Sequence, residues 1–364
     1  MRVIMTGGGT GGHIYPAIAI ADKIAERTHD SEILFVGTTH GLEKDLVPKA
    51  GYPIKFVTAQ GIDRKHLLRN IKVFADYNRG RSQAKKIIEE FKPDIVIGTG
   101  GYASGPVVKT AAAMGIPCYI HEQNAFPGVT NKMLEKSVRK VFLGFEEGGA
   151  YFKQKRKHVV TGNPVRAEFF TADRAKSREM LGLKDDEFML LAFGGSQGAG
   201  KINKAMIDIV KRYNGIKEVQ VFFATGKAYF DIIQTELEDA EIVLEDNIHM
   251  LEYIQDMQDY LSACDLVISR SGALSVSEIA VCGRPSILIP SPNVTGDHQT
   301  FNAKTISDKG GAVLLEEERL SGETLFEEIE RLRKDPELLE EMAQATAKCA
   351  PVDATDIIYY GLIT

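Results

Sequence analysis

The stretch VIMTGGGTGGHIYPAI (residues 3–18) joins a short apolar run, a glycine-rich loop and a segment with helical periodicity. The apolar run predicts a buried strand, and the loop leads directly into a helix. A strand, a loop and a helix in this order form the repeating unit of α/β domains built on a parallel sheet. The loop GGGTGGH (7–13) is costly to order, because glycine loses more backbone freedom on folding than any other residue. The near absence of side chains indicates that another group approaches this backbone closely.

Units of this kind recur in two series along the chain. The apolar runs of the first series are 3–5, 32–37, 54–57, 94–98, 118–121 and 140–144. Those of the second series are 188–194, 219–226, 248–254, 265–269, 285–290 and 311–315. Near-continuous runs of Val, Ile and Leu separated by helical segments are typical of parallel sheets with helices on both faces.

The two series correspond to each other. The unit at 3–18 has the same plan as LLAFGGSQGAGKINKAM (190–206). Further on, DIVIGTGGYASGPVVKTAAAMGIP (94–117) parallels DLVISRSGALSVSEIAVCGRP (265–285). These parallels predict an α/β fold with two doubly wound, Rossmann-like domains of similar size.

The boundary between the domains is expected near HVVTGNPVR (158–166), where Gly162 and Pro164 interrupt regular structure. We predict an N-terminal domain over 1–162 and a C-terminal domain over 163–364, whose last helix can pack back on the N-terminal domain. Ligands of doubly wound sheets bind at the carboxyl ends of the strands. With two domains facing each other, we expect the active site in the cleft between them.

The composition excludes several classes of protein. Of 364 residues, 44% are hydrophobic and 26% are charged, and the net charge of −6 argues against nucleic acid as the main partner. No apolar run approaches the roughly 20 residues that span a bilayer, and the N-terminus lacks the apolar region of a signal peptide. The four cysteines form no CxxC pair and no zinc-like cluster, so we expect free thiols in a reducing compartment and no metal site. We therefore expect a protein of the cytoplasm or of a membrane surface.

The first glycine loop formally fits the dinucleotide fingerprint G-x-G-x-x-G. That fingerprint needs an acidic residue at the end of the second strand, but FVGTTHGLE (35–43) has glycine and threonines there. A nicotinamide-dependent oxidoreductase is therefore disfavoured. The loop is not a P-loop either, because the Gly-Lys-Ser/Thr ending is missing and His13 stands at the place of the lysine.

Four glycine-rich loops precede predicted helices, at 7–13, 98–106, 194–200 and 270–278. Free backbone N–H groups and the positive end of the helix dipole favour anionic ligands, so four such loops predict a large ligand with phosphates. The chain has no D-x-D motif, and we expect helix dipoles and cations such as Arg166 to balance a departing nucleoside diphosphate. His13 is a candidate general base near pH 7, the alternative being a structural histidine bonded to backbone.

Seven motifs follow one another in a familiar order: GGGTGGHIYPA (7–17), GTGGYASGP (98–106), IHEQNAFPGVTNK (120–132), TGNPVR (161–166), GGSQGA (194–199), SRSGALSVSE (269–278) and GDHQTFNA (296–303). Together they resemble the MurG-type family of bacterial peptidoglycan glycosyltransferases, within glycosyltransferase family 28. The resemblance extends from residue 1 to about 305. It implies the two-domain GT-B fold, with the donor mainly on the C-terminal domain.

The activity that the resemblance implies is an inverting, hexosyl-type transfer. N-acetylglucosamine would pass from UDP-N-acetylglucosamine to the C4 hydroxyl of undecaprenyl-pyrophosphoryl-N-acetylmuramoyl-pentapeptide, converting lipid I into lipid II for the cell wall. No tightly bound cofactor is implied, and a divalent cation would at most stimulate. Two alternatives stay open: a related GT-B transferase with another lipid acceptor, and a non-catalytic sensor of sugar nucleotides.

The family's site residues carry over to matching positions of this chain. The implied donor site consists of Arg166, Ser196, Ile254, Ala273, Leu274, Ser275, Val276, Ser277, Glu278 and Gln299. The Ile254 backbone would pair with uracil, and the Glu278 carboxylate would accept bonds from both ribose hydroxyls. Ser196 and Arg166 would hold the diphosphate, and Gln299 would bind sugar hydroxyls. His298 departs from those members that have a second glutamine before Gln299.

On the N-terminal domain, the resemblance implies a site around the transferred sugar and the acceptor. Thr10, Gly11, Gly12 and Asn124 match positions that surround these groups. His13 matches the family's candidate base, and Glu122 lies nearby in HEQN as a second candidate catalytic residue.

A lipid-linked acceptor requires a surface that reaches a membrane. Residues 64–92 carry nine basic and three acidic side chains, a charge of +6 in a chain of net charge −6. The expected contact residues are Leu67, Leu68, Arg69, Ile71, Lys72 and Phe74. Each buried apolar side chain contributes roughly 1.5–3 kcal/mol and each nearby cation about 1 kcal/mol on an anionic leaflet. That favours reversible, peripheral binding at the cytoplasmic face, although the apolar stripe could instead be the core face of a helix.

Overall fold

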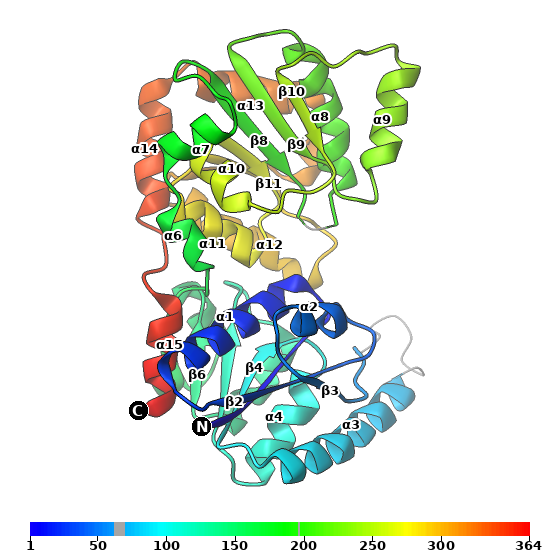
Figure 1. Cartoon of the computed structure of the whole chain (residues 1–364), viewed down its shortest axis with the longest axis vertical. Helices are drawn as coiled ribbons and strands as arrows, with labels where there is room; N and C mark the ends of the chain where they lie inside the picture. Colours follow the sequence, from blue (N-terminus) through cyan, green and yellow to red (C-terminus); the bar gives the residue numbers. More distant parts are fainter. Residues whose placement is uncertain (62–69, 196) are drawn as a thin grey trace. The chain divides into compact units, whose positions relative to one another are not determined.

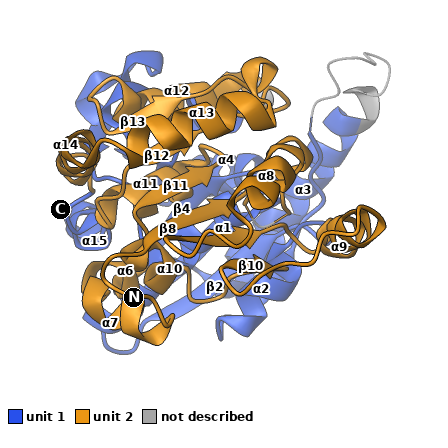
Figure 2. Cartoon of the chain, turned by 90° about the horizontal axis from the view of Figure 1, so that it is seen from above, with its two compact units in different colours: residues 1–165, 351–364 blue, residues 166–350 orange. Residues whose placement is uncertain are grey.

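The structure is a computed structural model, and it describes residues 1–61, 70–195 and 197–364. The chain forms two compact units (Figures 1 and 2). Unit 1 comprises residues 1–165 together with 351–364, and unit 2 comprises 166–350. The chain passes into unit 2 three residues after the boundary expected at 162, and its last fourteen residues belong to unit 1.

Unit 1 is built on a parallel sheet, as its apolar runs predicted. Its strands are β1 (Arg2–Gly7), β2 (Glu32–Gly37), β3 (Ile54–Phe56), β4 (Ile95–Gly100), β5 (Cys118–Glu122), β6 (Lys140–Leu143) and β7 (His158–Val160). In the described residues these seven strands lie in the order β3-β2-β1-β4-β5-β6-β7. Each neighbouring pair is parallel, so the expected sheet class is confirmed.

Helices cover both faces of this sheet. The described helices of unit 1 are α1 (Gly11–Arg27), α2 (Glu43–Lys49), α3 (Asn70–Phe91), α4 (Ser104–Ala113), α5 (Val129–Leu134) and α15 (Ala354–Ile363). Short 3-10 turns are η2 (Glu135–Ser137), η3 (Glu146–Tyr151) and η4 (Lys155–Lys157). Successive residues of a strand point to opposite faces. Val3 and Met5 of β1 accordingly pack with α1 and α15, whereas Ile4 packs with α3 and α4.

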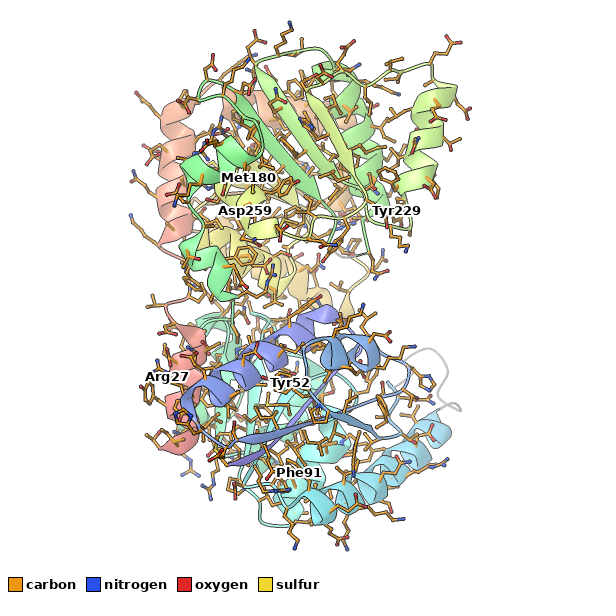
Figure 3. The ribbon with its side chains drawn as sticks, viewed as in Figure 1. Arg27, Tyr52, Phe91, Met180, Tyr229 and Asp259 are labelled. Atoms are coloured by element: carbon orange, nitrogen blue, oxygen red, sulfur yellow. The ribbon has the colours of Figure 1, made fainter. Side chains whose placement is uncertain are left out.

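The last helix, α15, is bound to unit 1 by core packing and by polar contacts. Ile358 is fully buried in the core that α1 covers. Arg27, labelled in Figure 3 at the end of α1, donates to Asp356 over 3.1 Å. The Tyr119 hydroxyl donates to the Leu362 carbonyl over 3.2 Å. The C-terminus thus completes the helical layer on one face of the first sheet.

Unit 2 repeats the plan with a second parallel sheet. Its strands are β8 (Phe188–Phe193), β9 (Val219–Ala224), β10 (Ile248–Leu251), β11 (Leu266–Ser269), β12 (Ser286–Leu288) and β13 (Ala312–Leu314). Within the described part of the chain, the order is β10-β9-β8-β11-β12-β13.

The helices of unit 2 follow its strands in alternation. They are α6 (Ala167–Thr171), α7 (Arg174–Met180), α8 (Gly200–Tyr213), α9 (Phe230–Asp239), α10 (Met257–Ala263), α11 (Ala273–Val281), α12 (His298–Ser307), α13 (Gly322–Arg333) and α14 (Pro336–Ala347), with 3-10 turns η5 (Thr295–Asp297) and η6 (Glu317–Arg319). Ile202, Met206 and Ile209 of α8 recur at helical spacing and pack with Leu325 and Ile329 of α13 in one core.

Both sheets have a point where the strand order reverses direction. In unit 1 it lies between β1 and β4, and in unit 2 between β8 and β11. These are the strands of the repeats found in the sequence, so the correspondence between the halves is confirmed. Ligands of doubly wound sheets bind outside the carboxyl ends of the strands at such a switch point. None of the helices in the described residues is long and apolar enough to cross a membrane.

Candidate functional site

The four glycine loops occupy the carboxyl ends of the strands at the two switch points. They lead into α1, α4, α8 and α11. In the described part of the chain, none of these four helices has a side-chain cap at its N-terminus or an acidic residue in its first turn. Four other helices are capped, by Asp173, Ser321, Asp335 and Asp353. The uncapped amides at the switch points remain available to an anionic ligand.

In unit 1 the two glycine loops touch each other. A Cβ atom on Gly101 would lie 2.3 Å from the carbonyl oxygen of Gly8, and its φ of 79° is left-handed. A Cβ atom on Gly100 would lie 2.8 Å from the His13 ring. These glycines are therefore required by the contact between the β1–α1 and β4–α4 loops, which no feature of the sequence had indicated.

A buried carboxylate, that of Glu43, fixes the first loop from the other side. It accepts a bond of 2.8 Å from the amide of Gly9 and two bonds of 2.8 Å from the amide and hydroxyl of Thr38. A Cβ atom on Gly8 would overlap the carboxylate at 2.4 Å. Sequence reasoning missed Glu43, because an acidic residue in the first turn of a short helix reads as a solvated side chain.

Gly12, by contrast, has no neighbour that demands a glycine. A Cβ atom there would meet only the Thr10 hydroxyl, at 3.7 Å, an ordinary contact. Thr10 is the N-cap residue of α1, and its side chain does not cap the helix. The glycines at the start of the loop thus accommodate the protein itself, whereas Gly12 leaves backbone open at the helix start. Of the whole loop, this end best fits the close approach that the sequence predicted.

His13 lies on the first turn of α1, partly exposed. Its Nδ1 is 3.0 Å from the Oε1 atom of Gln123, the residue that follows β5. The Thr99 hydroxyl donates to the His13 carbonyl over 2.8 Å. Among residues 1–61, 70–195 and 197–364, no hydrogen bond to its Nε2 is found. The imidazole therefore combines one tethered nitrogen with one open nitrogen.

Gln123 itself lies in a buried chain of hydrogen bonds. Its Nε2 is 2.9 Å from Nδ1 of His121 and 3.2 Å from the His121 carbonyl oxygen. Nε2 of His121 is 3.2 Å from the carbonyl oxygen of Gly162. Burial lowers the pKa of His121 to about 4, so this imidazole is neutral near pH 7. The sequence singled out the HEQN motif but assigned no role to either residue.

Glu122, the last residue of β5, is also buried. One carboxylate oxygen accepts from the backbone and side-chain nitrogens of Asn124, over 3.0 and 3.1 Å. The other accepts from the amide of Gly128 and the side chain of Asn131, over 3.0 and 2.9 Å. This arrangement holds the HEQN loop against α5. The catalytic role expected for Glu122 stays a prediction, and its geometry favours positioning of Asn124.

In unit 2, the expected ribose and phosphate residues lie on the first turns of α11. Ala273, Val276 and Ser277 are buried, whereas Leu274 and Ser275 are partly exposed. The Ser277 hydroxyl donates to the Ala273 carbonyl over 2.9 Å. Ser275 is therefore the hydroxyl of this turn that is presented at the surface.

Glu278 lies one turn further along α11. Burial raises the pKa of this carboxyl to about 7, and the positive charge of Arg166 opposes the rise. Arg166 is the N-cap residue of α6, and its guanidinium lies over the Phe169 ring, 5.1 Å from the centroid. A carboxylate and a guanidinium thus share one neighbourhood, as residues for a ribose and a diphosphate would.

The remaining donor residues lie on separate loops. The Oε1 atom of Gln299 accepts from the Ser291 amide over 2.8 Å, which leaves its amide nitrogen to donate. Ile254 lies after β10 with its side chain 4% exposed, so the side chain anchors the loop whose backbone would pair with uracil. Ser196 lies outside the described residues, between Gly195 and Gln197.

The expected membrane surface is only partly covered by the structure. Leu67, Leu68 and Arg69 lie outside the described residues, and Ile71 and Lys72 belong to α3, but their side chains are not described. Phe74 is 69% exposed on α3. For this residue, the alternative that the stripe is buried as a core face does not hold.

Two family models match the chain, the first within unit 1 and the second over most of unit 2 and the start of the C-terminal segment that belongs to unit 1. The model described as the N-terminal domain of glycosyltransferase family 28 matches residues 3–143. The model described as the C-terminal domain of the same family matches residues 189–357. The two matches include the glycine loops of both switch points.

Curated relatives match over nearly the whole chain. The UDP-N-acetylglucosamine–N-acetylmuramyl-(pentapeptide) pyrophosphoryl-undecaprenol N-acetylglucosamine transferase of Desulforamulus reducens is 46% identical over 98% of this chain and 97% of its own. The protein of the same name from Acetivibrio thermocellus is 44% identical over 99% of this chain and 96% of its own. The crystal structure of MurG from Acinetobacter baumannii matches with a TM-score of 0.79 and 28% identity, over 100% of this chain and 99% of that one.

Proposed function

The chain belongs to glycosyltransferase family 28, and we propose that it transfers N-acetylglucosamine from UDP-N-acetylglucosamine to undecaprenyl-pyrophosphoryl-N-acetylmuramoyl-pentapeptide. The product would be lipid II, the disaccharide precursor of peptidoglycan. The observation that carries this proposal is the 46% identity, over 98% of the chain, to a relative whose name specifies both substrates. Two Rossmann-like units of the GT-B type, each with paired glycine loops at a switch point, are consistent with it.

The reaction needs a base, and His13 is the candidate. Its Nε2 would take the proton from the C4 hydroxyl of the muramyl sugar as the oxygen attacks C1 of N-acetylglucosamine. The bond between C1 and the diphosphate oxygen breaks on the opposite face, and UDP leaves with the bonding electrons. Attack from that face inverts the anomeric centre and gives a β-1,4 linkage.

The departing diphosphate gains negative charge that the protein must stabilise. Arg166 and the uncapped starts of α8 and α11 supply positive potential in unit 2. We propose that no tightly bound cofactor is required and that a divalent cation only stimulates. Turnover that persists in excess EDTA would support this part of the proposal, and its complete loss, restored by a divalent cation, would contradict it.

We propose further that the enzyme binds the cytoplasmic face of the cell membrane as a peripheral protein. Phe74 on α3 is exposed, and so are the basic side chains of Arg79, Lys85 and Lys86 on the same helix. Exposed apolar and basic side chains together favour an anionic leaflet. Co-sedimentation with anionic vesicles should fall in Phe74→Ser and should be lost with neutral vesicles.

The experiment that tests the activity measures UDP release from UDP-N-acetylglucosamine, with and without a soluble analogue of the lipid-linked muramyl-pentapeptide. Release that depends on the analogue, with the sugar recovered on it, would establish both substrates. Tight binding of UDP-N-acetylglucosamine without such release would contradict the proposed acceptor. The chain would then be assayed with other lipid acceptors, or as a sensor.

A further inference from the structure

A line of hydrogen bonds runs from the backbone of Gly162 to the imidazole of His13. It passes through His121 and Gln123, both buried on or next to β5. All four residues belong to unit 1. The line therefore lies within one packed body, and it ends at the side chain that the proposed reaction uses as a base.

The Gly162 carbonyl determines the state of His121. A carbonyl oxygen only accepts hydrogen bonds, so the His121 Nε2 that lies 3.2 Å from it must carry the proton. Because this imidazole is neutral near pH 7, its Nδ1 has no proton and must accept. The donor that it accepts from is the amide nitrogen of Gln123, 2.9 Å away.

A second carbonyl fixes the orientation of the Gln123 amide. The amide nitrogen also lies 3.2 Å from the His121 carbonyl oxygen, which again can only accept. Rotating the amide by half a turn would place its oxygen against this carbonyl and against a nitrogen that cannot donate. The Gln123 oxygen therefore faces His13, and it lies 3.0 Å from His13 Nδ1.

We propose that Gln123 is a positioning residue that holds the neutral His13 imidazole with its proton on Nδ1. An imidazole with a proton on Nδ1 has its lone pair on Nε2, which is the open nitrogen. The proposal deepens the proposed function, on which it rests, because it specifies which atom of the base takes the proton. Gln123 does not touch substrate in this scheme and acts only through His13.

The choice of an amide over a carboxylate has a chemical consequence. A carboxylate at this position would also accept from Nδ1, but its charge would favour the protonated imidazole. A protonated imidazole cannot accept the proton of a sugar hydroxyl. The neutral Gln123 oxygen orients His13 without adding that charge.

The first test reads the tautomer directly and needs no turnover. In protein with ¹⁵N-labelled histidines, two-bond nitrogen–proton correlations distinguish the Nδ1–H from the Nε2–H form. The His13 signals are assigned by their loss in His13→Gln. We expect the Nδ1–H form in the wild-type protein and a shift toward the Nε2–H form in Gln123→Leu. An Nε2–H form in the wild-type protein would overturn the proposal, whatever the enzyme's substrates prove to be.

The second test uses turnover. Gln123→Leu should lower kcat by about 10- to 100-fold and leave KM for the donor within about twofold, because the base remains but is misoriented. Gln123→Glu should retain more activity at high pH than Gln123→Leu does. The acidic limb of its pH–rate profile should move to higher pH than in the wild-type enzyme. An unchanged kcat in Gln123→Leu, or an unmoved profile in Gln123→Glu, would contradict the positioning role.

The chain offers a matched control in Gln220. Its Oε1 lies 3.1 Å from Nε2 of His249, so it forms a second glutamine–histidine pair, in unit 2 near the amino ends of β9 and β10. Gln220→Leu removes a bond of the same kind and should leave kcat and the pH profile unchanged. If the wild-type enzyme shows no transfer at all, the proposed function fails, while the tautomer measurement still decides the role of Gln123.

Discussion

The carboxylate of Glu43 accepts a hydrogen bond of 2.8 Å from the backbone amide of Gly9, which lies 34 residues earlier in the chain. This bond ties the β2–α2 loop to the glycine loop that precedes α1. The other carboxylate oxygen accepts hydrogen bonds from the backbone amide and the hydroxyl of Thr38. The glycine loop beside His13 is thus held in place by the Glu43 carboxylate, whose residue is only 1% exposed.

Replacing Glu43 by Gln should loosen this loop. An amide can present only one oxygen, so either Gly9 or Thr38 would lose its acceptor and face a second donor. A buried donor left without a partner costs about 1–3 kcal/mol, and we expect a loss of this size in the free energy of unfolding, measured with urea. Turnover should fall as well, because the loop carries the candidate acceptor residues.

The control for this variant is Glu89→Gln on α3. Glu89 is 55% exposed and lies 3.7 Å from Lys85, a surface pair that contributes about 0.5 kcal/mol or less. Equal effects of the two substitutions on stability would show that the Glu43 bonds do not hold the loop.

Gly12→Ala should separate ligand binding from folding. The structure has room for the added Cβ atom, and alanine favours helix over glycine by up to about 1 kcal/mol, so stability should stay equal or rise. If an acceptor or sugar lies against this backbone, kcat/KM should fall by about 10-fold or more. Wild-type kinetics in Gly12→Ala would show that no ligand approaches here.

Gly101→Ala is the comparison variant, in which the same substitution is made at a glycine that the packing requires. Its Cβ atom would overlap the Gly8 carbonyl, and its φ is left-handed, so stability should fall by about 2 kcal/mol or more. Thermal unfolding of the two alanine variants, run side by side, compares a glycine that packing requires with one that packing does not.

The repeating units could be predicted because apolar runs and glycine loops carry their own local signal. The order of motifs then pointed to the family and to the residues of the candidate site. Gln123 and Glu43 could not be assigned, because their roles depend on partners brought together by the sheet rather than on spacing. The close approach of Gly101 to Gly8 was hidden for the same reason. The packing of the last helix on the N-terminal domain was expected, but the residues that hold it there, such as Ile358, depend on tertiary contacts that the apolar pattern of α15 does not specify.

Glu278 predicts a pH dependence of stability. The pKa of its carboxyl group is about 7 in the folded protein, whereas the ordinary value, taken for the unfolded chain, is 4.5. The folded state therefore binds the carboxyl proton more tightly than the unfolded state does. The ionised carboxylate therefore destabilises the protein above about pH 7, by at most about 3–4 kcal/mol, and this cost vanishes below about pH 4.5. Glu278→Gln should raise the free energy of unfolding at pH 8 and change it little at pH 5. The opposite order would contradict the raised pKa.

The same residue predicts a pH dependence of donor binding. If the Glu278 carboxylate accepts from both ribose hydroxyls, binding of UDP-N-acetylglucosamine should weaken as the pH falls below about 7 and the group takes up a proton. Glu278→Gln should bind about 10- to 100-fold more weakly at pH 8, with little remaining dependence on pH. Calorimetric titration at pH 6 and pH 8 measures both effects, and equal affinity of the two proteins at pH 8 would remove Glu278 from the donor site.

Ile358 predicts how far unit 1 depends on its C-terminal helix. The side chain is fully buried in the core that also contains Ile14 and Met5, so Ile358→Ala leaves a cavity and should cost about 2–5 kcal/mol. Ile357, its neighbour, is 38% exposed, and Ile357→Ala should cost about 1 kcal/mol or less. Hydrogen exchange should show faster exchange in β1 and α1 of Ile358→Ala, with the strands of unit 2 unchanged, because α15 belongs to the core of unit 1. Equal protection of β1 in the two variants would mean that α15 contributes little to the stability of that core.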